Sequence, residues 1–303
     1  MMSILLTGGT GQIGFELRSA LASLGRVIAV SRNEMDLLKP DTIAATLDHH
    51  CPDLIINAAA YTQVDRAESE PGLAQSINGD ACGILAEQAV KIGCPLIHYS
   101  TDYVFDGSAS RAYRPDDQTQ PLGVYGETKL AGERAIMESG CEFLILRTSW
   151  IYSGGRQNFV RTMLRLGEER PMIRVVDDQR GSPTWSRTVA RSTLGILRKG
   201  LIRHNNRWIL GIPSGVFHLT AQGDTTWYEF ALKIFDLADL NPRPMVEPIS
   251  TDAFPTPARR PAYSVLDCSE TMDGFGIALP HWEDALDEFM EGGAVAESSS
   301  HAV

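Results

Sequence analysis

The first half of the chain alternates short apolar runs with longer amphipathic segments, and this alternation limits the fold more than any other feature. Helical periodicity covers residues 11–24, 40–50, 70–92 and 126–139. The runs rich in β-branched residues predict strands at Ser3–Thr7, Arg26–Ser31, Asp53–Ala58, Pro95–Ser100 and Phe143–Thr148. Such alternation is typical of an α/β fold with a doubly wound parallel sheet. Right-handed crossovers would bring all carboxyl ends of the strands to one ligand-binding edge.

A glycine-rich turn joins the first predicted strand to the first predicted helix. Gly8, Gly11 and Gly14 form the pattern Gly-x-x-Gly-x-x-Gly. At a first strand-to-helix turn, glycines let the backbone approach a pyrophosphate, and the helix N-terminus offers amide donors. A purely structural tight turn is the alternative. We therefore predict a Rossmann-type sheet whose dinucleotide contacts are Gly8, Thr10, Gly11, Gln12, Ile13 and Gly14.

The segment VIAVSRNEMD, at the end of the second predicted strand, is expected to meet the adenosine ribose. Ser31 and Arg32 suit a 2′-phosphate, whereas an acidic residue would bind a 2′-hydroxyl, and Asp36 lies close behind. We predict NADPH, with NADH as the alternative because Arg32 also fits a solvated surface charge. The candidates in this segment are Ser31, Arg32, Asp36 and Leu37.

After residue 150 the alternation weakens and proline becomes frequent, above all in residues 241–264. Proline removes backbone donors and breaks helices, so we interpret that stretch as binding loops of a smaller C-terminal substrate-binding lobe. We expect a dinucleotide-binding domain at residues 1–150 with returning elements near 184–220. The lobe would comprise residues 151–183 and 221–291. The small, polar residues 292–303 predict a disordered tail.

Composition and charge exclude several classes of protein. The net charge of −11 argues against binding to nucleic acid or to an anionic membrane surface. The five cysteines form no Cys-x-x-Cys pair, and no histidine cluster has metal-ligand spacing, so we expect reduced structural thiols and no metal site. No apolar run approaches the roughly 20 residues that span a bilayer, and no leader pattern begins the sequence. We predict a cytoplasmic protein.

A catalytic group is predicted from two separate segments. Tyr125 and Lys129 stand at i and i+4, on one face of a predicted helix. Ser100 and Thr101 end a strand whose carboxyl edge faces the same cleft as the glycine turn. Hydride delivery to a ketone leaves an alkoxide that needs a proton, and a phenol beside an ammonium can donate it. Lys129 would hold the nicotinamide ribose, and Thr101 would hydrogen-bond the carbonyl. The alternative is a packed Tyr125 and an exposed Lys129.

Seven motifs together resemble the dTDP-4-dehydrorhamnose reductase family of the extended short-chain dehydrogenase/reductase superfamily. They are the glycine turn, NAAAYTQVDRAESE, YSTDYVFDG, YGETKLAGE, RTSWIY, DDQRGSPT and PTPARRPAYSVLD. The resemblance covers about residues 2–290. It implies reduction of the 4-keto group of dTDP-6-deoxy-L-lyxo-4-hexulose to dTDP-L-rhamnose by NADPH or NADH.

The resemblance also implies roles for particular residues. Thr101, Tyr125 and Lys129 would be catalytic, and both Tyr125 and Lys129 would touch the cofactor. The cofactor would further be lined by Asn57, Ala58 and Ala59, and the sugar by Asp102, Tyr103 and Trp150. Arg260 would meet the nucleotide diphosphate. From the residues alone, Trp150 fits a core position equally well, and the arginines at 259 and 260 fit loop charges.

One departure from the family concerns a metal. Some members resemble this chain at Glu16 but carry carboxylates in the helix after the Gly-x-Pro-Thr motif, where this sequence reads WSRTVARST. A Mg²⁺-linked dimer is therefore not expected, and we predict a monomer or a weak homodimer formed in another way.

Three other functions stay open. Sugar-nucleotide dehydratases resemble the chain around Thr101 but follow the Thr-Asp pair with a glutamate, where Tyr103 stands here. An epimerase is disfavoured only by the later reductase-type motifs. A regulatory subunit, such as the beta subunit of methionine adenosyltransferase, also resembles these reductases but would not require Thr101, Tyr125 and Lys129 together.

Overall fold

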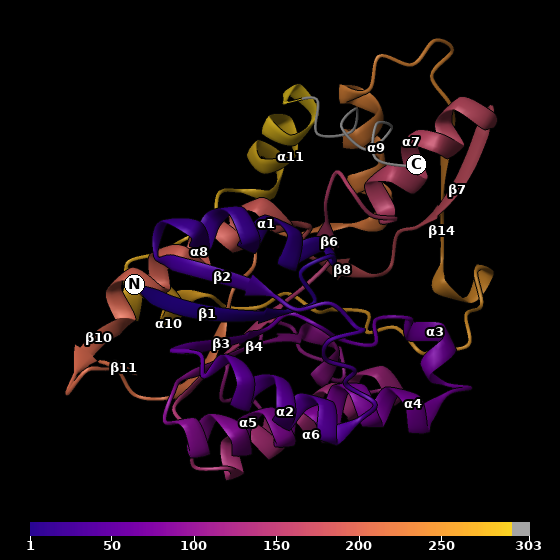
Figure 1. The fold of residues 1–303 in the computed structure, drawn as a ribbon. Helices are drawn as coiled ribbons and strands as arrows, with labels where there is room; N and C mark the ends of the chain where they lie inside the picture. The colour runs from indigo at the N-terminus through magenta and orange to yellow at the C-terminus, as the bar shows by residue number, and fades with distance from the viewer. Residues whose placement is uncertain (293–303) are drawn as a thin grey trace.

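The computed structural model describes residues 1–292 and has a six-stranded parallel sheet at its centre (Figure 1). The order across the sheet is β12-β5-β4-β3-β1-β2. The strands are β1 Met2–Thr7, β2 Gly25–Ala29, β3 Leu54–Asn57, β4 Leu96–Thr101, β5 Phe143–Thr148 and β12 Gly215–His218. The order reverses between β1 and β3, because the chain passes from β1 to β2 and then returns to the other side of β1. Ligands of doubly wound sheets bind outside the carboxyl ends of the strands at such a reversal.

Alternation along the strands explains why both faces of the sheet are covered. Ile4 and Leu6 of β1 pack into one buried cluster, whereas Leu5 between them packs into another. Successive side chains of a strand point to opposite faces, so runs that are apolar at every position need helices on both sides. The predicted doubly wound α/β fold is confirmed.

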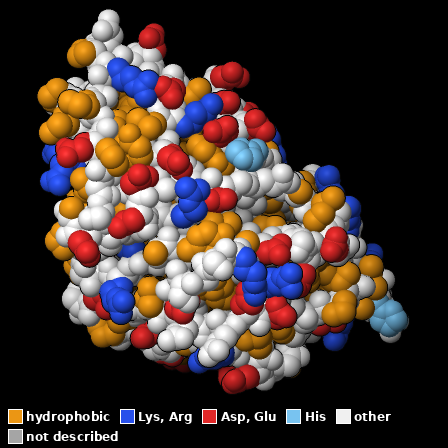
Figure 2. Space-filling view, turned by 180° about the vertical axis from the view of Figure 1, so that it is seen from behind, with side chains coloured by type: hydrophobic (Ala, Val, Ile, Leu, Met, Phe, Trp, Pro, Cys, Tyr) orange, Lys and Arg blue, Asp and Glu red, His pale blue; other side chains and the backbone are white. Residues whose placement is uncertain are grey.

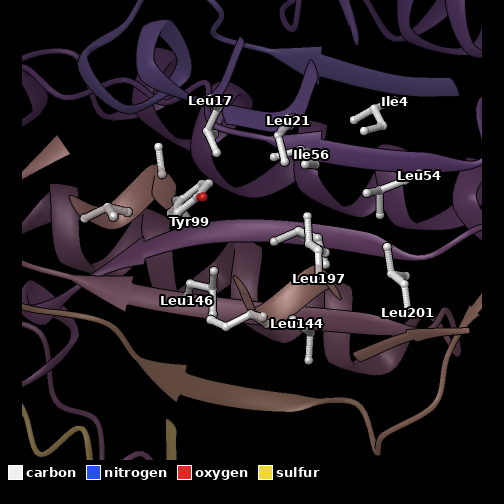
Figure 3. Packing of buried hydrophobic residues seen from close by; sticks show 14 of the residues in the cluster. Ile4, Leu17, Leu21, Leu54, Ile56, Tyr99, Leu144, Leu146, Leu197 and Leu201 are labelled. Atoms are coloured by element: carbon white, nitrogen blue, oxygen red, sulfur yellow. The ribbon is translucent and has the colours of Figure 1, made fainter. Parts of the chain in front are cut away.

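Two groups of helices supply those layers (Figure 1). One face carries α1 Gln12–Ala20, α8 Ser186–Gly200 and α10 Ser269–Phe275, and the other carries α2 Pro40–His50, α5 Ala81–Ile92 and α6 Val124–Glu138. Figure 3 shows Leu17 of α1, Leu21 just after that helix and Leu197 of α8 meeting Ile56 and Leu144 of the sheet. Burial of such side chains contributes about 2 kcal/mol each and fixes the helices against the sheet.

A separate cluster of buried aromatic and aliphatic side chains lies beyond the sheet edge (Figure 1). It joins helices α7, α9 and α11 to a two-stranded parallel sheet, with Trp185 and Phe230 buried at its centre. Its elements are α7 Phe159–Glu169, β7 Met172–Val176, α9 Trp227–Leu237, β14 Met245–Ile249 and α11 Trp282–Glu291.

The remaining elements are short. The hairpin β10 Leu201–His204 and β11 Arg207–Leu210 precedes β12. Two-residue strands pair as β6 with β9 and β8 with β13. They are β6 Ile151–Tyr152, β8 Arg180–Gly181, β9 Thr184–Trp185 and β13 Thr225–Thr226. The remaining helical turns are α3 Val64–Ala67, α4 Pro71–Gln75, the π-helix η2 Ser76–Asp80, and the 3₁₀ turns η1 Leu21–Ser23, η3 Asp102–Val104 and η4 Thr251–Ala253.

Three details differ from the sequence expectations. Residues 241–264 are not all loop, because β14 pairs with β7 there. Pro248 is tolerated in β14 because the sheet has only two strands, so one edge of each strand has no neighbouring strand to hydrogen-bond with. The expected helix 70–92 is divided by the π-helix η2, and β2 ends at Ala29, so Ser31 and Arg32 lie in the following turn. Apart from Gly292, the tail expected to be disordered lies outside the described residues.

The surface carries charges of both signs. On the face shown in Figure 2, basic side chains stand among acidic ones. Within residues 1–292, no helix combines the length and the apolar character needed to cross a membrane.

Candidate active site

Three strand ends bring the predicted site residues to one edge of the sheet. Thr7 of β1 pairs in register with Asn57 of β3, and Asn57 pairs with His98 of β4. Thr101, at the end of β4, pairs with Thr148 of β5. The glycine turn, the segment that begins at Asn57 and the Thr101 segment therefore lie side by side at the carboxyl edge.

The glycine turn is shaped by backbone contacts. Gly8 has φ +66°, and a Cβ there would lie 2.6 Å from backbone atoms of Ala58 and Ala59. A Cβ on Gly14 would lie 2.1 Å from the Gly8 carbonyl oxygen. Helix α1 starts with Gly11 as its N-cap and with no side chain bonded to its first amides. The turn thus needs glycine for its own packing and also leaves amide donors at a helix N-terminus, a cradle that fits a dinucleotide pyrophosphate.

A loop from the second part of the chain lies against this turn. Ser153 Oγ donates to Gln12 Oε1 at 2.9 Å, and Arg156 Nε donates to the Thr10 carbonyl at 2.8 Å. Gln12 Nε2 is 3.4 Å from the Ile151 carbonyl. Arg156 was not a sequence candidate, because no local pattern around it points to the glycine turn.

The segment after β2 presents charges of both signs. The Ser31 amide and hydroxyl both donate to Glu34 Oε2 at 2.8 Å, and Arg32 Nε lies 3.6 Å from Asp36 Oδ1. The Arg32 side chain is 73% exposed. Arg32 is therefore free to rotate toward a 2′-phosphate, while Asp36 offers an acceptor to a 2′-hydroxyl.

The catalytic candidates converge at the start of α6. Tyr125 lies in its first turn, and burial raises the pKa of the phenol, while a hydrogen bond with the Thr101 hydroxyl acts in the opposite direction. Thr101 Oγ1 donates to Asp102 Oδ1 at 3.0 Å and accepts the Tyr103 amide at 3.2 Å. Tyr125 is thus held as a phenol, the form that is able to donate a proton.

Lys129, one turn further along α6, is buried, with 2% of its surface exposed. Its Nζ donates to the Tyr99 carbonyl at 2.7 Å and lies 3.0 Å from Nε2 of His98. Burial lowers the pKa of this ammonium, and nearby Cys82 and Glu133 oppose that effect. The alternative of an exposed surface lysine is wrong.

Asp102 is a buried carboxyl at the centre of the site. Burial raises its pKa from 3.8 to about 6, although hydrogen bonds from Ser264 and Thr101 favour the charged form. A carboxyl that binds its proton more tightly in the folded state stabilises the fold below its ordinary pKa, and this contribution is lost as the pH rises through about 6.

We expect Asp102→Asn to remove that loss. Relative to the unmodified protein, the variant should gain about 3 kcal/mol in free energy of unfolding between about pH 4 and about pH 8. Urea denaturation at several pH values measures the gain. Asp106→Asn is the matched control with the opposite sign, because backbone and side-chain hydrogen bonds from Ser108 lower the pKa of Asp106. A pH-independent difference for Asp102→Asn would contradict the burial argument.

Tyr103 and Arg260 form one cluster beside Tyr125. The Tyr103 and Tyr125 rings are edge to face at 5.7 Å, and Arg260 Nη1 donates to the Tyr103 hydroxyl at 3.3 Å. Arg260 also donates to both carboxylate oxygens of Asp65 at 2.9 Å. Its guanidinium is therefore oriented by an acidic partner, and Arg259 is the more exposed of the two arginines.

Trp150 stands in a different aromatic group. It has φ +46° and stacks on Trp227 with ring centroids 3.5 Å apart and planes 3° apart. A Cβ on Gly181 would lie 2.5 Å from the Trp150 indole, so the Gly-x-Pro-Thr motif makes room for this ring. Trp227 was not a sequence candidate, because α9 is distant in the chain.

Two other residues that sequence reasoning missed lie inside or directly beside the motifs quoted above. Glu68, from the NAAAYTQVDRAESE segment, accepts the Val124 amide at 2.9 Å and so caps the helix that carries Tyr125 and Lys129. His98, next to the YSTDYVFDG motif, contacts Lys129 directly. The motifs drew attention to these positions. Residue spacing alone, however, did not identify the residues that they contact.

Glu16 has a partner from within the chain. Its carboxylate lies 3.4 Å from Arg187 Nε of α8, and Arg191 of the same helix lies 3.2 Å from Glu288 of α11. Among residues 1–292, no group of three or more histidine, cysteine or acidic side chains is arranged to hold a metal ion. The five cysteines are free thiols.

Known proteins share both the sequence and the fold. The family model described as "RmlD substrate binding domain" matches residues 2–294. dTDP-4-dehydrorhamnose reductase of Burkholderia thailandensis is 44% identical over 291 residues, covering 94% of this chain and 97% of that protein. The reductase of Escherichia coli K12 is 43% identical over 290 residues, covering 93% and 95%. The solved Bacillus anthracis dTDP-4-dehydrorhamnose reductase in complex with NADP has a TM-score of 0.87 at 33% identity, covering 96% and 99%.

The parallel sheet, the glycine turn and the Thr101, Tyr125 and Lys129 arrangement define an NAD(P)-dependent oxidoreductase of the extended short-chain dehydrogenase/reductase superfamily. Within it, the chain belongs to the dTDP-4-dehydrorhamnose reductase family.

Proposed function

We propose that the chain reduces the 4-keto group of dTDP-6-deoxy-L-lyxo-4-hexulose, with NADPH, to dTDP-L-rhamnose. The observation that carries the proposal is the half-buried Tyr125 phenol, hydrogen-bonded to Thr101 and one helical turn from the buried Lys129, at the carboxyl edge of the sheet. The curated relatives at 44% and 43% identity are named for this activity.

The proposal gives each of these residues a role in the reaction. NADPH supplies the hydride that adds to C4 of the sugar. Tyr125 gives its proton to the developing alkoxide, so the ketone becomes an alcohol and Tyr125 becomes a phenolate. The Thr101 hydroxyl and the Lys129 charge stabilise that phenolate until a solvent proton restores the phenol. Burial of Thr101 and Lys129 strengthens these interactions by excluding water.

Cofactor and substrate contacts complete the proposal. The glycine turn would hold the pyrophosphate, and Asn57, Ala58 and Ala59 would line the nicotinamide half. Asp102, Tyr103 and Trp150 would contact the sugar, and Arg260, oriented by Asp65, would meet the diphosphate. We also propose that the protein acts in the cytoplasm, as a monomer or as a weak dimer without a bridging metal.

The test measures the loss of reduced-nicotinamide absorbance when purified protein is mixed with NADPH and the 4-keto-6-deoxy sugar nucleotide. That substrate is made in situ by a dehydratase and a 3,5-epimerase, with the epimerase omitted as a control. Oxidation only when the epimerase is present supports the proposal, with NMR of the product to establish its stereochemistry. Measurable NADPH binding without oxidation contradicts it and favours another nucleotide sugar or a regulatory role.

Arg32→Asp tests the choice of cofactor. The ratio of kcat/KM for NADPH to that for NADH should fall by about tenfold or more, because a 2′-phosphate would lose a cation and meet a carboxylate. Lys39→Asp is the matched control, since Lys39 is equally exposed and also neighbours Asp36. An unchanged ratio in Arg32→Asp would refute the assignment to the 2′-phosphate.

A further inference from the structure

A line of buried polar side chains runs from β1 to the catalytic helix. Thr7 Oγ1 lies 2.6 Å from the Asn57 side-chain amide, and that amide lies 3.1 Å from Nδ1 of His98. Nε2 of His98 then lies 3.0 Å from Lys129 Nζ. Asn57 and His98 have at most 1% of their surface exposed. Buried polar groups without partners are costly, so a continuous line of this kind holds each member in one place.

His98 is neutral in this setting. Burial, and then the neighbouring Lys129 charge, hold the pKa of His98 well below its usual value. A neutral imidazole has one donor and one acceptor nitrogen. Because an ammonium only donates, Nε2 must accept from Lys129 and Nδ1 must carry the proton.

That tautomer determines the orientation of Asn57. The structure places Asn57 Oδ1 toward Thr7 and Asn57 Nδ2 toward His98 Nδ1. The protonated Nδ1 needs an acceptor, so this tautomer requires the carboxamide in the opposite orientation, with its oxygen toward His98 and its NH₂ group toward Thr7. The oxygen and nitrogen of a terminal amide have the same shape, and their assignment follows from the hydrogen bonds around them. Thr7 Oγ1 also accepts the Ala59 amide at 3.3 Å, so the line ends on the segment that follows β3.

The same contacts account for the three donors of Lys129. One N–H is taken by the Tyr99 carbonyl and a second by His98 Nε2. The third is left for the reacting groups. Around Lys129, Cys82 of α5 is a neutral thiol because burial raises its pKa to about 11, and Glu133 of α6 is committed to Arg147 of β5. His98 is therefore the side-chain acceptor that orients the Lys129 ammonium.

We propose that His98, held as the Nδ1–H tautomer by Asn57, is a positioning residue that keeps Lys129 charged and aimed at Tyr125 and the cofactor. This rests on the proposed function only in its kinetic consequences, because the tautomer can be observed without substrate.

The kinetic test compares two substitutions of His98. His98→Leu removes the acceptor, so kcat should fall about tenfold or more, and the alkaline limb of the kcat profile should move about one pH unit or more lower. His98→Gln offers an amide oxygen to Lys129 and an NH₂ group to Asn57, and it should restore the profile toward that of the unmodified protein. His218→Leu is the control, since His218 is also buried but its Nδ1 faces the Asp267 carbonyl. If the alkaline limb of the kcat profile stayed at the same pH in His98→Leu as in the unmodified protein, the proposal would be overturned.

The second test is ¹⁵N NMR of the histidine rings without substrate. His98 should show a protonated Nδ1 and an unprotonated Nε2 near neutral pH. In Lys129→Met, the preference of His98 for this tautomer should be lost. An Nε2–H tautomer or a charged ring in the unmodified protein would overturn the proposal. If the sugar nucleotide is not turned over at all, the proposed function fails, and the NMR result still decides the role of His98.

Discussion

Tyr125→Phe should lower kcat for the proposed reduction by about 100- to 10,000-fold, the usual contribution of a general acid. The phenyl ring keeps the packing of the half-buried side chain but has no proton to give to the alkoxide. Cofactor affinity should change little, because the hydroxyl contributes one contact among many. Steady-state kinetics together with a fluorescence titration of NADPH separate these two effects.

Tyr113, a buried tyrosine, provides the control. The Tyr113 hydroxyl donates to Asp106 at 2.7 Å, and its ring stacks on Phe105, away from the catalytic group. Tyr113→Phe should therefore keep kcat within about twofold. Turnover by Tyr125→Phe at the rate of the unmodified protein would show that another group donates the proton.

Glu133→Gln should reduce the free energy of unfolding by about 3–5 kcal/mol, because it leaves a buried guanidinium without its counter-charge. Arg147 Nε and Nη2 donate to the two Glu133 oxygens at 2.9 and 2.7 Å, and both side chains are at most 4% exposed. Arg147 also donates to the Pro115 carbonyl and lies over the Phe105 ring. The pair joins α6 to β5, so the helix that carries Tyr125 and Lys129 should loosen as stability falls.

Urea denaturation measures this loss, and an exposed pair is the reference. Arg165 and Glu169 lie 2.8 Å apart at i and i+4 in α7, about half exposed. Glu169→Gln should change stability by less than about 1 kcal/mol, since solvent screens such pairs. If Glu133→Gln lowered the free energy of unfolding no more than Glu169→Gln does, the buried pair would contribute nothing specific to the fold.

The site was partly predictable because chemistry concentrates in short motifs. Gly8, Thr101, Tyr125 and Lys129 stand next to strand ends or at helical spacing, and parallel topology alone places those strand ends together. Glu68, Asp65 and His98 were not assigned, although they lie in or beside quoted motifs, because their partners Val124, Arg260 and Lys129 are 31 to 195 residues away.

Local sequence thus determined the helices and strands of this protein. Apolar side chains repeat with a period of two in strands and 3.6 in helices, and that pattern is a property of neighbouring residues. It also determined the glycine turn, because the missing Cβ atoms are local. The tertiary structure decided which groups are buried together, and burial is what changes their chemistry. The raised pKa of Asp102, the neutral His98 beside Lys129 and the stacking of Trp150 on Trp227 all depend on segments that meet only in the folded chain.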